Sequence, residues 1–412
     1  MRLSISTRYA TRSLRRHTRR TILAILGIGL GSGVCLFMVA FVRGEGQMML
    51  KAAAESGAGH FRVVPAAWPE TRENDLRLPQ WERIRDMLRS MDEIAVVAPH
   101  ARTEGLLAFG TRVQGVEIVG ADPNTEQAAN RLVRHIVEGA YLTPGALGTV
   151  VIGRGVAERL DVELDDALMV TVADSEGEMN GAMLRIIGIA ETGSEDLDAT
   201  ICHVNLEDVE RLTGLAGAAD LTVLVTEPRR LADMIDAVTG RLPAGCTVVT
   251  WKEIMPEMAS GVEVDKTWTR LTVAIVMIVV FLGIMSAQLA AVLERRREFA
   301  VLAALGMKSG RLVSVMLMEG LILGLLGSVL GLVFGLPAAY YVATEGIDFT
   351  DFYGSDMSVS NVLFDPVFKG DFGWWLVPLA FELALAATLL SSLYPAWFAI
   401  RTDPAVALRV EH

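Results

Sequence analysis

The chain has 412 residues, 52% of them hydrophobic, and a formal net charge of −12. Together with a mean hydropathy of +0.40, this composition argues against one soluble domain and is ordinary for a membrane protein with a large aqueous part. The three cysteines are too few for a disulfide framework, and no Cys/His cluster has the spacing of a zinc site, so we expect no bound metal. Basic and acidic residues are segregated along the chain, which indicates membrane topology and argues against nucleic-acid binding.

The chain begins with a basic segment that leads into an apolar run. Residues 1–20 carry several arginines and no acid, which predicts a cytoplasmic amphipathic helix on an anionic membrane surface. The apolar residues that follow, 21–43, predict the first transmembrane helix. A cleaved signal peptide is the alternative, but the run is too long for a typical signal sequence and no clean small-x-small cleavage site follows it.

Residues 44–266 are aqueous in composition and predict a large extracytoplasmic α+β domain. Their periodicity and turn residues indicate a β-α-β unit at each end, about 44–102 and 220–266, and a more β-rich insert, about 103–219. We expect the two end units to pair and the insert to project from them. The predicted strands are 60–64, 94–99, 149–152, 168–173, 183–190, 200–204, 221–226 and 247–251, and the predicted helices are 80–91, 154–160, 206–212 and 228–242.

This domain also contains a predicted hairpin turn and two cysteines whose state is open. The polar, glycine-bearing stretch Asp174–Ala182 lies between two predicted strands and indicates a hairpin turn. Cys202 and Cys246 lie in the same domain, where they either form a disulfide in an oxidising compartment or remain two buried thiols.

The second half of the chain repeats the pattern of apolar runs and charged links. Each run is long enough for a helix to cross a bilayer, and the bases lie on the side that the first helix assigns to the cytoplasm. We therefore expect four transmembrane helices with both termini cytoplasmic. The remaining segments are transmembrane helices at 267–293, 312–344 and 372–400, a cytoplasmic link at 294–311, an acidic outer loop at 345–371 and a cytoplasmic tail at 401–412.

Glycines recur at helical-face spacings in two of the spans. Small residues four apart let membrane helices approach closely, whereas a merely glycine-rich span is the alternative. We expect packing faces, and we expect Gly29→Leu to weaken pairing between subunits. The glycines concerned are Gly27, Gly29, Gly31, Gly33, Gly320, Gly324, Gly327 and Gly331.

The cytoplasmic link 294–311 is basic and long enough for an amphipathic helix of its own on the membrane face. It could serve only to join two helices, or a soluble partner could grip it, and the second is our hypothesis. The residues that would make this contact are Glu294, Arg295, Arg296, Arg297, Glu298, Phe299, Leu302, Leu305, Gly306 and Met307.

Motifs for chemistry are missing from the sequence. No GxxxxGK[ST], GxSxG, HExxH or EF-hand loop occurs, so we expect no catalytic residue and no cofactor bound by this chain. Two carboxylates lie within predicted spans, where ionisable residues are costly. Glu319 is close to the inner interface and favours an anchoring role over proton transport, whereas Glu382 is expected to face a helix partner or a wet cavity.

Several stretches resemble the FtsX-like permeases of ABC transporters. LERRREFAVLAALGMKSGRL is similar to the family's core, YPAWFAIRTDPAVALRVE to its tail, and RYATRSLRRHTRRTILAILGI to its basic opening helix and first span. VVIGRGVAERLDVELDD, RIIGIAETGSEDLDATICHVNLEDVERLTGL and WKEIMPEM resemble the lipoprotein-releasing permeases of the LolC/LolE type more than the macrolide exporters of the MacB type.

The resemblance implies an architecture and partners. Such permeases work as dimers, alike or different, with a separate ATPase on each side that binds ATP and magnesium and docks on Glu294–Gly310. Their outer domain is a porter with an inserted sabre. Acylated cargo would enter sideways from the outer leaflet of the membrane, between the first and second helices of the paired subunits, which correspond to 21–42 and 271–293 here. An outer hairpin would hold a periplasmic carrier. The matching hairpin residues here are Asp174, Ser175, Glu176, Gly177, Glu178 and Met179.

Three functions fit this resemblance. The first is a permease subunit in the inner membrane that uses ATP hydrolysis by a separate subunit to extract lipoproteins and pass them to a periplasmic carrier. The second is a MacB-like exporter of amphiphilic small molecules or peptides. The third is FtsX-like transmembrane signalling to a periplasmic enzyme, with nothing transported. The size of the outer domain favours the first two, because a relay needs less material.

Overall fold

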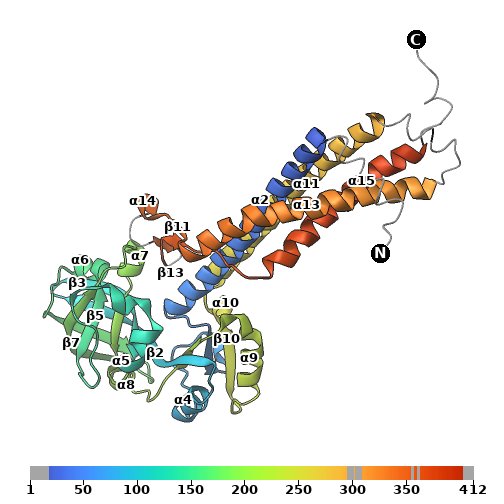
Figure 1. Cartoon of the computed structure of the whole chain (residues 1–412). Helices are drawn as coiled ribbons and strands as arrows, with labels where there is room; N and C mark the ends of the chain where they lie inside the picture. The colour runs from blue at the N-terminus through green and yellow to red at the C-terminus, as the bar shows by residue number, and fades with distance from the viewer. Residues whose placement is uncertain (1–17, 295–300, 302–308, 354–356, 360–361, 402–412) are drawn as a thin grey trace. The chain divides into compact units, whose positions relative to one another are not determined.

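The computed structural model describes residues 18–294, 301, 309–353, 357–359 and 362–401. The chain divides into two compact units (Figure 1). We call them the helical unit, which holds Met1–Gln47, Val264–Ile347 and Phe368–His412, and the mixed unit, which holds Met48–Glu263 and Asp348–Val367.

Four helices of the described chain are long and apolar enough to cross a membrane. Helix α2 has 38 residues, about 57 Å at 1.5 Å per residue, which exceeds the roughly 30 Å of a bilayer core. It therefore continues beyond residue 43, where the sequence predicts its end, because the Ala-rich stretch that follows supports a helix. The four are α2 (Thr18–Glu55), α11 (Pro256–Glu294), α13 (Ser309–Thr344) and α15 (Leu376–Arg401).

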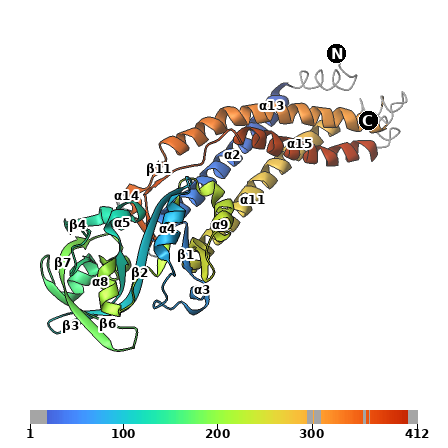
Figure 2. The same ribbon diagram turned by 90° about the horizontal axis from the view of Figure 1, so that it is seen from below.

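The helical unit is built around α13, which lies beside α15 (Figure 2). At one level of the bundle, Leu36 of α2, Ala339 of α13 and Ala380 of α15 form a buried apolar cluster. Near it, Arg43 stacks at 4.1 Å over Trp375 and lies 3.6 Å from Asp371. An arginine and a tryptophan together at the end of an apolar span are typical of a membrane interface.

In the mixed unit, the strands of the two β-α-β units form one antiparallel sheet in the order β10-β1-β9-β2. The two end units therefore pair, as the sequence predicts, whereas the interleaved strand order was not predicted. Helices α4 (Trp81–Arg89) and α9 (Leu231–Thr239) cover one face, and the core between them includes Phe61, Leu88 and Val223. The strands are β1 (Phe61–Pro65), β2 (Ile94–Phe109), β9 (Asp220–Val225) and β10 (Cys246–Thr250).

Strand β2 continues into the insert. Its first half pairs with β9, and its second half pairs with β3 and β6. The expected boundary between residues 102 and 103 therefore lies inside one strand. The insert has its own apolar core under α6 (Arg154–Leu160) and α8 (Leu206–Thr213). Its other strands are β3 (Arg112–Ala121), β4 (Ile136–Gly139), β5 (Thr149–Gly153), β6 (Ala167–Ala173), β7 (Met179–Ala190) and β8 (Cys202–Asn205).

The segment expected as a plain outer loop has structure and belongs largely to the mixed unit. Val362 and Phe364 pack against Trp251 and Met258 in one buried cluster. Arg131 also bonds to Asp365. The elements of this segment are β11 (Ile347–Asp348), α14 (Thr350–Tyr353), β12 (Met357–Val359), β13 (Val362–Phe364) and β14 (Val367–Phe368).

Short helical elements fill the connections of the mixed unit. The sequence predicts none of them except the turn at Pro228, which it includes in a longer helix. They are α3 (Trp68–Thr71), α5 (Pro123–Ala129), the 3-10 turn Arg131–His135, α7 (Glu195–Asp198), the 3-10 turn Pro228–Arg230 and α10 (Trp251–Ile254).

The cysteines are free thiols, so the disulfide alternative does not hold. Cys202 belongs to the apolar core of the insert, and Cys246 packs against the core beneath the other half of the sheet. Burial raises the pKa of the Cys202 thiol to about 12, so it stays protonated and is a poor nucleophile.

Candidate functional site

The first packing face of the helical unit joins α2 to α13. A Cβ atom on Gly29 would lie 2.7 Å from Leu330 Cδ2, and one on Gly33 would lie 3.3 Å from the carbonyl oxygen of Gly331. The first distance, to a side-chain atom, is shorter than real Cβ contacts allow, and the second shows that the backbones of α2 and α13 approach closely at Gly33. A Cβ on Gly331 would in turn meet the side chain of Ser32.

The other glycines predicted to form packing faces also meet helices of the same chain, with one exception. On α13, Gly324 would place a Cβ 2.5 Å from Thr388 Oγ1 of α15. Gly27 has no atom within 4 Å in the described chain. The remaining contacts are Gly31 with Val280, Gly320 with Ser392 and Gly327 with Ile28.

These contacts change what is expected of Gly29→Leu. The partner of Gly29 is Leu330 of the same polypeptide, so the direct effect of a larger side chain falls on the fold of the helical unit and not on subunit pairing. Gly27, which lies on the same helix, is the glycine whose added side chain has room.

The two carboxylates in the spans lie in different surroundings. Glu319 is half-buried in α13, whereas Glu382 is exposed on α15. The exposed residues Pro378 and Ala386 lie one turn to either side of Glu382, so it belongs to an outward stripe of the helix. Within this chain it therefore does not face an enclosed cavity.

The expected coupling residues fall mostly outside the described residues. Glu294 is the last residue of α11 and is exposed. The rest of the set lies outside the described residues and comprises Arg295, Arg296, Arg297, Glu298, Phe299, Leu302, Leu305, Gly306 and Met307.

The expected carrier hairpin is the connection between β6 and β7. Asp174 closes the turn by accepting the backbone N–H groups of Glu176 at 2.9 Å and Glu178 at 3.0 Å. The N–H of Ser175 donates to the carbonyl of Thr213 at 3.0 Å, which ties the turn to the end of α8. Met179 begins β7 and is 65% exposed. Gly177 has a φ of +83°, which explains a glycine there.

This turn is shorter than the sequence predicts. Asn180 and Gly181, which read as turn residues, pair with Val172 and Thr171 in the β6–β7 ladder. The hairpin therefore ends in a compact acidic tip whose polar side chains are mostly exposed.

Comparison with known proteins assigns both halves of the chain. A model of the MacB-like periplasmic core domain matches residues 21–241, more than half of the chain, and a model of the FtsX-like permease C-terminal region matches residues 270–404. This chain belongs to the FtsX-like permease family.

Relatives of this permease fall into two groups. The lipoprotein-releasing system transmembrane protein LolC of Xylella fastidiosa is 23% identical over 395 residues, which are 94% of this chain and 93% of the relative. LolE of Haemophilus influenzae is 21% identical over 413 residues, 98% of each chain. The macrolide export ATP-binding/permease protein MacB of Hyphomonas neptunium is 25% identical over 422 residues, but this permease spans only 61% of its length.

The permease also buries a charged network that sequence reasoning missed. His100 Nε2 lies 2.7 Å from Glu126 Oε2, and its Nδ1 lies 3.2 Å from Thr222 Oγ1. Arg102 Nε donates to Asp220 Oδ2 at 3.3 Å. The strand residues lie on the sheet face opposite α4 and α9, and Glu126 reaches them from α5. Because these polar residues alternate with apolar ones, the pattern reads as a solvent-facing strand surface.

The network holds its members in defined charge states. Burial alone would raise the pKa of Glu126, but the charge of His100 and hydrogen bonds from His100 and Asn130 lower it to about 2. Burial alone would lower the pKa of His100, yet Glu126 and Asp220 raise it above its ordinary 6.5. A buried charge without its partner is costly, so these pairs fix how α5 sits on the sheet.

Two other histidines of the mixed unit are buried in the neutral form. Burial lowers the pKa of His60 to about 4 and that of His203 to about 4. His203 Nδ1 forms a hydrogen bond with the hydroxyl of Tyr141 at 2.9 Å. His60 Nδ1 accepts the N–H of Val225 at 3.2 Å, which requires an unprotonated ring nitrogen.

We predict that Gly29→Leu destabilises the helical unit and that Gly27→Leu does not. The added side chain at residue 29 collides with Leu330, and overpacking costs roughly 1–3 kcal/mol. Thermal unfolding of the purified chain in detergent measures the difference between the two variants. Equal midpoints for both variants would contradict the packing face.

We predict that the mixed unit loses stability as pH falls from 6.5 towards 4. His60 and His203 are protonated at about pH 6.5 when unfolded but only near 4 when folded, so the unfolded state binds more protons in this window. Each histidine contributes at most about 1.4 kcal/mol per pH unit. His100 acts in the opposite direction at higher pH, because its pKa is raised in the folded state. Its contribution to stability is fully present below pH 6.5 and is lost as the pH rises above that value.

Chemical denaturation at several pH values measures this slope, and His203→Gln should make it shallower. An unchanged slope in that variant would show that His203 is not the neutral buried group. Below pH 4.5 the lowered pKa of Glu126 adds a further loss as its carboxylate protonates towards pH 2.

Proposed function

We propose that this chain is the permease subunit of an ABC transporter that extracts lipoproteins from the inner membrane and passes them to a periplasmic carrier. The proposal rests on how much of this chain and of its lipoprotein-releasing relative can be aligned. The chain and the lipoprotein-releasing LolC of Xylella fastidiosa align over 94% and 93% of their lengths. The MacB relative has further chain that this permease does not span. In this proposal the ATPase, which binds ATP and magnesium, is a separate subunit.

The work of such a transporter is large. Removing an acyl chain from lipid costs about 0.8 kcal/mol for each buried methylene, so several chains demand an energy source. A permease without a phosphate-binding loop in its sequence must receive that energy mechanically. Helices packed through glycines move as rigid elements, and the α2–α13 and α13–α15 contacts support this role.

The first two spans suit a lateral opening for acylated cargo. Within the apolar window of α11 only 12% is buried, against 33% in α2. Both helices present large apolar side chains outward, such as Leu23 at 70% and Val279 at 64% exposure. In the proposal these surfaces meet a second permease copy or a paralogue, membrane lipid and the acyl chains of the cargo.

The runner-up function is export of amphiphilic small molecules or peptides. It is favoured by the MacB relative, which aligns with 98% of this chain at 25% identity. In that case the mixed unit would drive cargo outward without a soluble carrier. FtsX-like signalling to a periplasmic enzyme has no specific support among these relatives.

Reconstitution distinguishes lipoprotein extraction from the export of amphiphiles. The chain is placed in proteoliposomes with its partner permease, the ATPase and a fluorescent acylated protein. Release of label that needs both ATP hydrolysis and a soluble carrier supports extraction. ATP-driven movement of amphiphiles, with the acylated protein left in the membrane, would support export instead.

We predict that reversing the charge of Arg295, Arg296 and Arg297 to Glu uncouples the ATPase. In the proposal the three arginines attract acidic groups of the ATPase, and the reversed charges would repel those groups. Transport should fall at least about ten-fold while the unfolding midpoint stays the same. The matched control reverses the exposed residues Arg83, Arg89 and Arg241 of the mixed unit. Full ATPase co-purification and stimulation in the first variant would argue against a docking role.

We predict that residue 176 is periplasmic and residue 301 cytoplasmic. After replacement of Cys35, Cys202 and Cys246, single cysteines are introduced at the exposed positions Glu176 and Val301. An impermeant maleimide should label the first in intact spheroplasts and the second only after permeabilisation. The reverse pattern would invert the proposed topology and place both termini outside.

A further inference from the structure

Three separate stretches of the mixed unit meet at Arg131, which begins the 3-10 turn after α5. Its Nε lies 3.4 Å from Oε2 of Glu55, the last residue of α2. Its Nη2 donates to Oδ1 of Asp365, in the segment between α13 and α15. A guanidinium group suits this position, because its planar fork of donors can serve two acceptors in fixed places. We call Glu55, Arg131 and Asp365 the Arg131 bridge.

The two carboxylates of the bridge come from stretches that also share a buried apolar cluster. This cluster contains Ala53 of α2, Met258 of α11 and Phe364 of β13. Helices α2 and α11 continue from the mixed unit into the helical unit, and the stretch 348–367 is connected to the helical unit at both of its ends. The cluster therefore joins these elements to one another, and the Arg131 bridge joins them to α5.

A continuous path of bonds runs from the bridge to strand β2. Ser56, which directly follows α2, forms an isolated antiparallel bridge with Asn130, the residue before Arg131. Asn130 Nδ2 donates to Glu126 Oε1 at 2.9 Å, and Glu126 Oε2 lies 2.7 Å from Nε2 of His100 on β2. Because β2 is shared by the two cores of the mixed unit, a displacement at this point of the strand reaches the insert.

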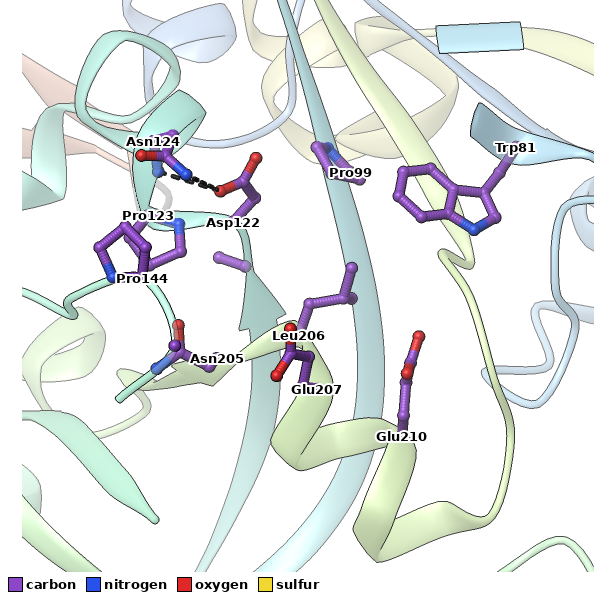
Figure 3. Close-up of a pocket in the computed structure, with 12 residues that line it drawn as sticks. Trp81, Pro99, Asp122, Pro123, Asn124, Pro144, Asn205, Leu206, Glu207 and Glu210 are labelled. Atoms are coloured by element: carbon purple, nitrogen blue, oxygen red, sulfur yellow. Dashed lines mark hydrogen bonds between the residues drawn. The ribbon is translucent and has the colours of Figure 1, made fainter. Parts of the chain in front are cut away.

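Helix α5 has open space at its start and close contacts at its end. Pro123, the first residue of α5, lines a pocket of about 320 Å³ whose far side is formed by Trp81 of α4 (Figure 3). At the other end, Ala129 packs against Ala54 of α2 and Ala98 of β2. Alanine side chains bury little apolar area, so polar contacts are needed to fix the position of α5 relative to α2.

The Arg131 bridge adds orientation more than stability. The side chain of Asp365 is 56% exposed and that of Glu55 is 22% exposed. Ion pairs that water reaches contribute little to the free energy of unfolding. The apolar cluster around Phe364 already holds the stretch 348–367 in place, so the bridge supplies a directional link between α2, this stretch and α5.

We propose that Arg131 is a positioning residue that transmits movement of α2 and of the stretch between α13 and α15 to α5 and β2, and through β2 to the insert. With the bridge intact, these elements move as one body. Without it, α2 turns while α5 and the insert stay behind. The inference rests on the proposed function only in requiring ATP-driven movement of the membrane helices, and it is the same for a lipoprotein and for an amphiphile as cargo.

Distances between spin labels test this transmission. Nitroxide labels are attached to cysteines introduced at the exposed residues Gln47 of α2 and Glu176 of the β6–β7 turn, after replacement of Cys35, Cys202 and Cys246. The complex with the partner permease and the ATPase is measured in lipid nanodiscs by double electron–electron resonance, without nucleotide and with ATP and vanadate. We expect one narrow distance distribution that is the same in both states.

The insert offers a matched control for Arg131. Arg154 is likewise held by two carboxylates, those of Glu138 at 2.7 Å and Glu191 at 3.4 Å, but all three residues belong to the insert. Arg131→Gln should broaden the distance distribution and make it differ between the two nucleotide states, whereas Arg154→Gln should behave as the unaltered chain. Arg131→Lys should have an intermediate effect, because an ammonium group cannot present a planar fork to two carboxylates.

Transport measurements on the same variants separate movement from stability. Arg131→Gln should lower the cargo released per ATP hydrolysed about ten-fold. The rate of ATP hydrolysis and the midpoint of thermal unfolding should both equal those of Arg154→Gln.

Two results would overturn the inference. The first is a distance distribution in Arg131→Gln that matches that of Arg154→Gln in both nucleotide states. The second is an unfolding midpoint of Arg131→Gln well below that of Arg154→Gln, which would make Arg131 a purely structural residue. If the labels behave as expected but the unaltered complex releases neither an acylated protein nor an amphiphile, the proposed function fails and the role of Arg131 is supported.

Discussion

The structure depends on the close approach of α2 and α13. In a bilayer, lipid tails are as apolar as leucine, so the hydrophobic effect cannot hold helices together and contact between small residues must do so. Gly29, Gly33 and Gly331 bring the two backbones together at this crossing. Gly324 and Thr388 do the same for α13 and α15. Helix α13 is therefore the axis on which the helical unit is assembled.

A second constraint organises the mixed unit, which is the sharing of one strand by two cores. Val97 of β2 belongs to the apolar core under α4 and α9, and Leu107 of the same strand belongs to the core of the insert. A strand with both ends buried in different cores cannot slip in register without exposing one of them. The buried charges around His100 lie between these two points of the strand, where they add directional bonds to the apolar packing.

Much of this architecture was predictable from the sequence, and the failures have physical causes. Helix 154–160 has the same bounds in the structure, because its apolar periodicity and flanking strand are unambiguous. Helix α2 is longer than predicted because hydropathy marks the membrane and not the end of a helix. Network residues such as His100 and Glu126 were missed because burial from both sides depends on α5, which contacts the sheet only in three dimensions. The pocket lined by Trp81, Pro99 and Asn205 combines residues from five stretches, which no local pattern brings together.

The position of residues 348–367 in the mixed unit has a consequence for exchanging modules between relatives. The chain passes from one unit to the other at residues 47, 263, 347 and 367, so the mixed unit is encoded by two separate stretches of the gene. Val362 and Phe364 complete the apolar cluster around Trp251. A chimera that transplants residues 48–263 alone would set these two side chains against a foreign surface. Recombination that preserves folding must carry both stretches together.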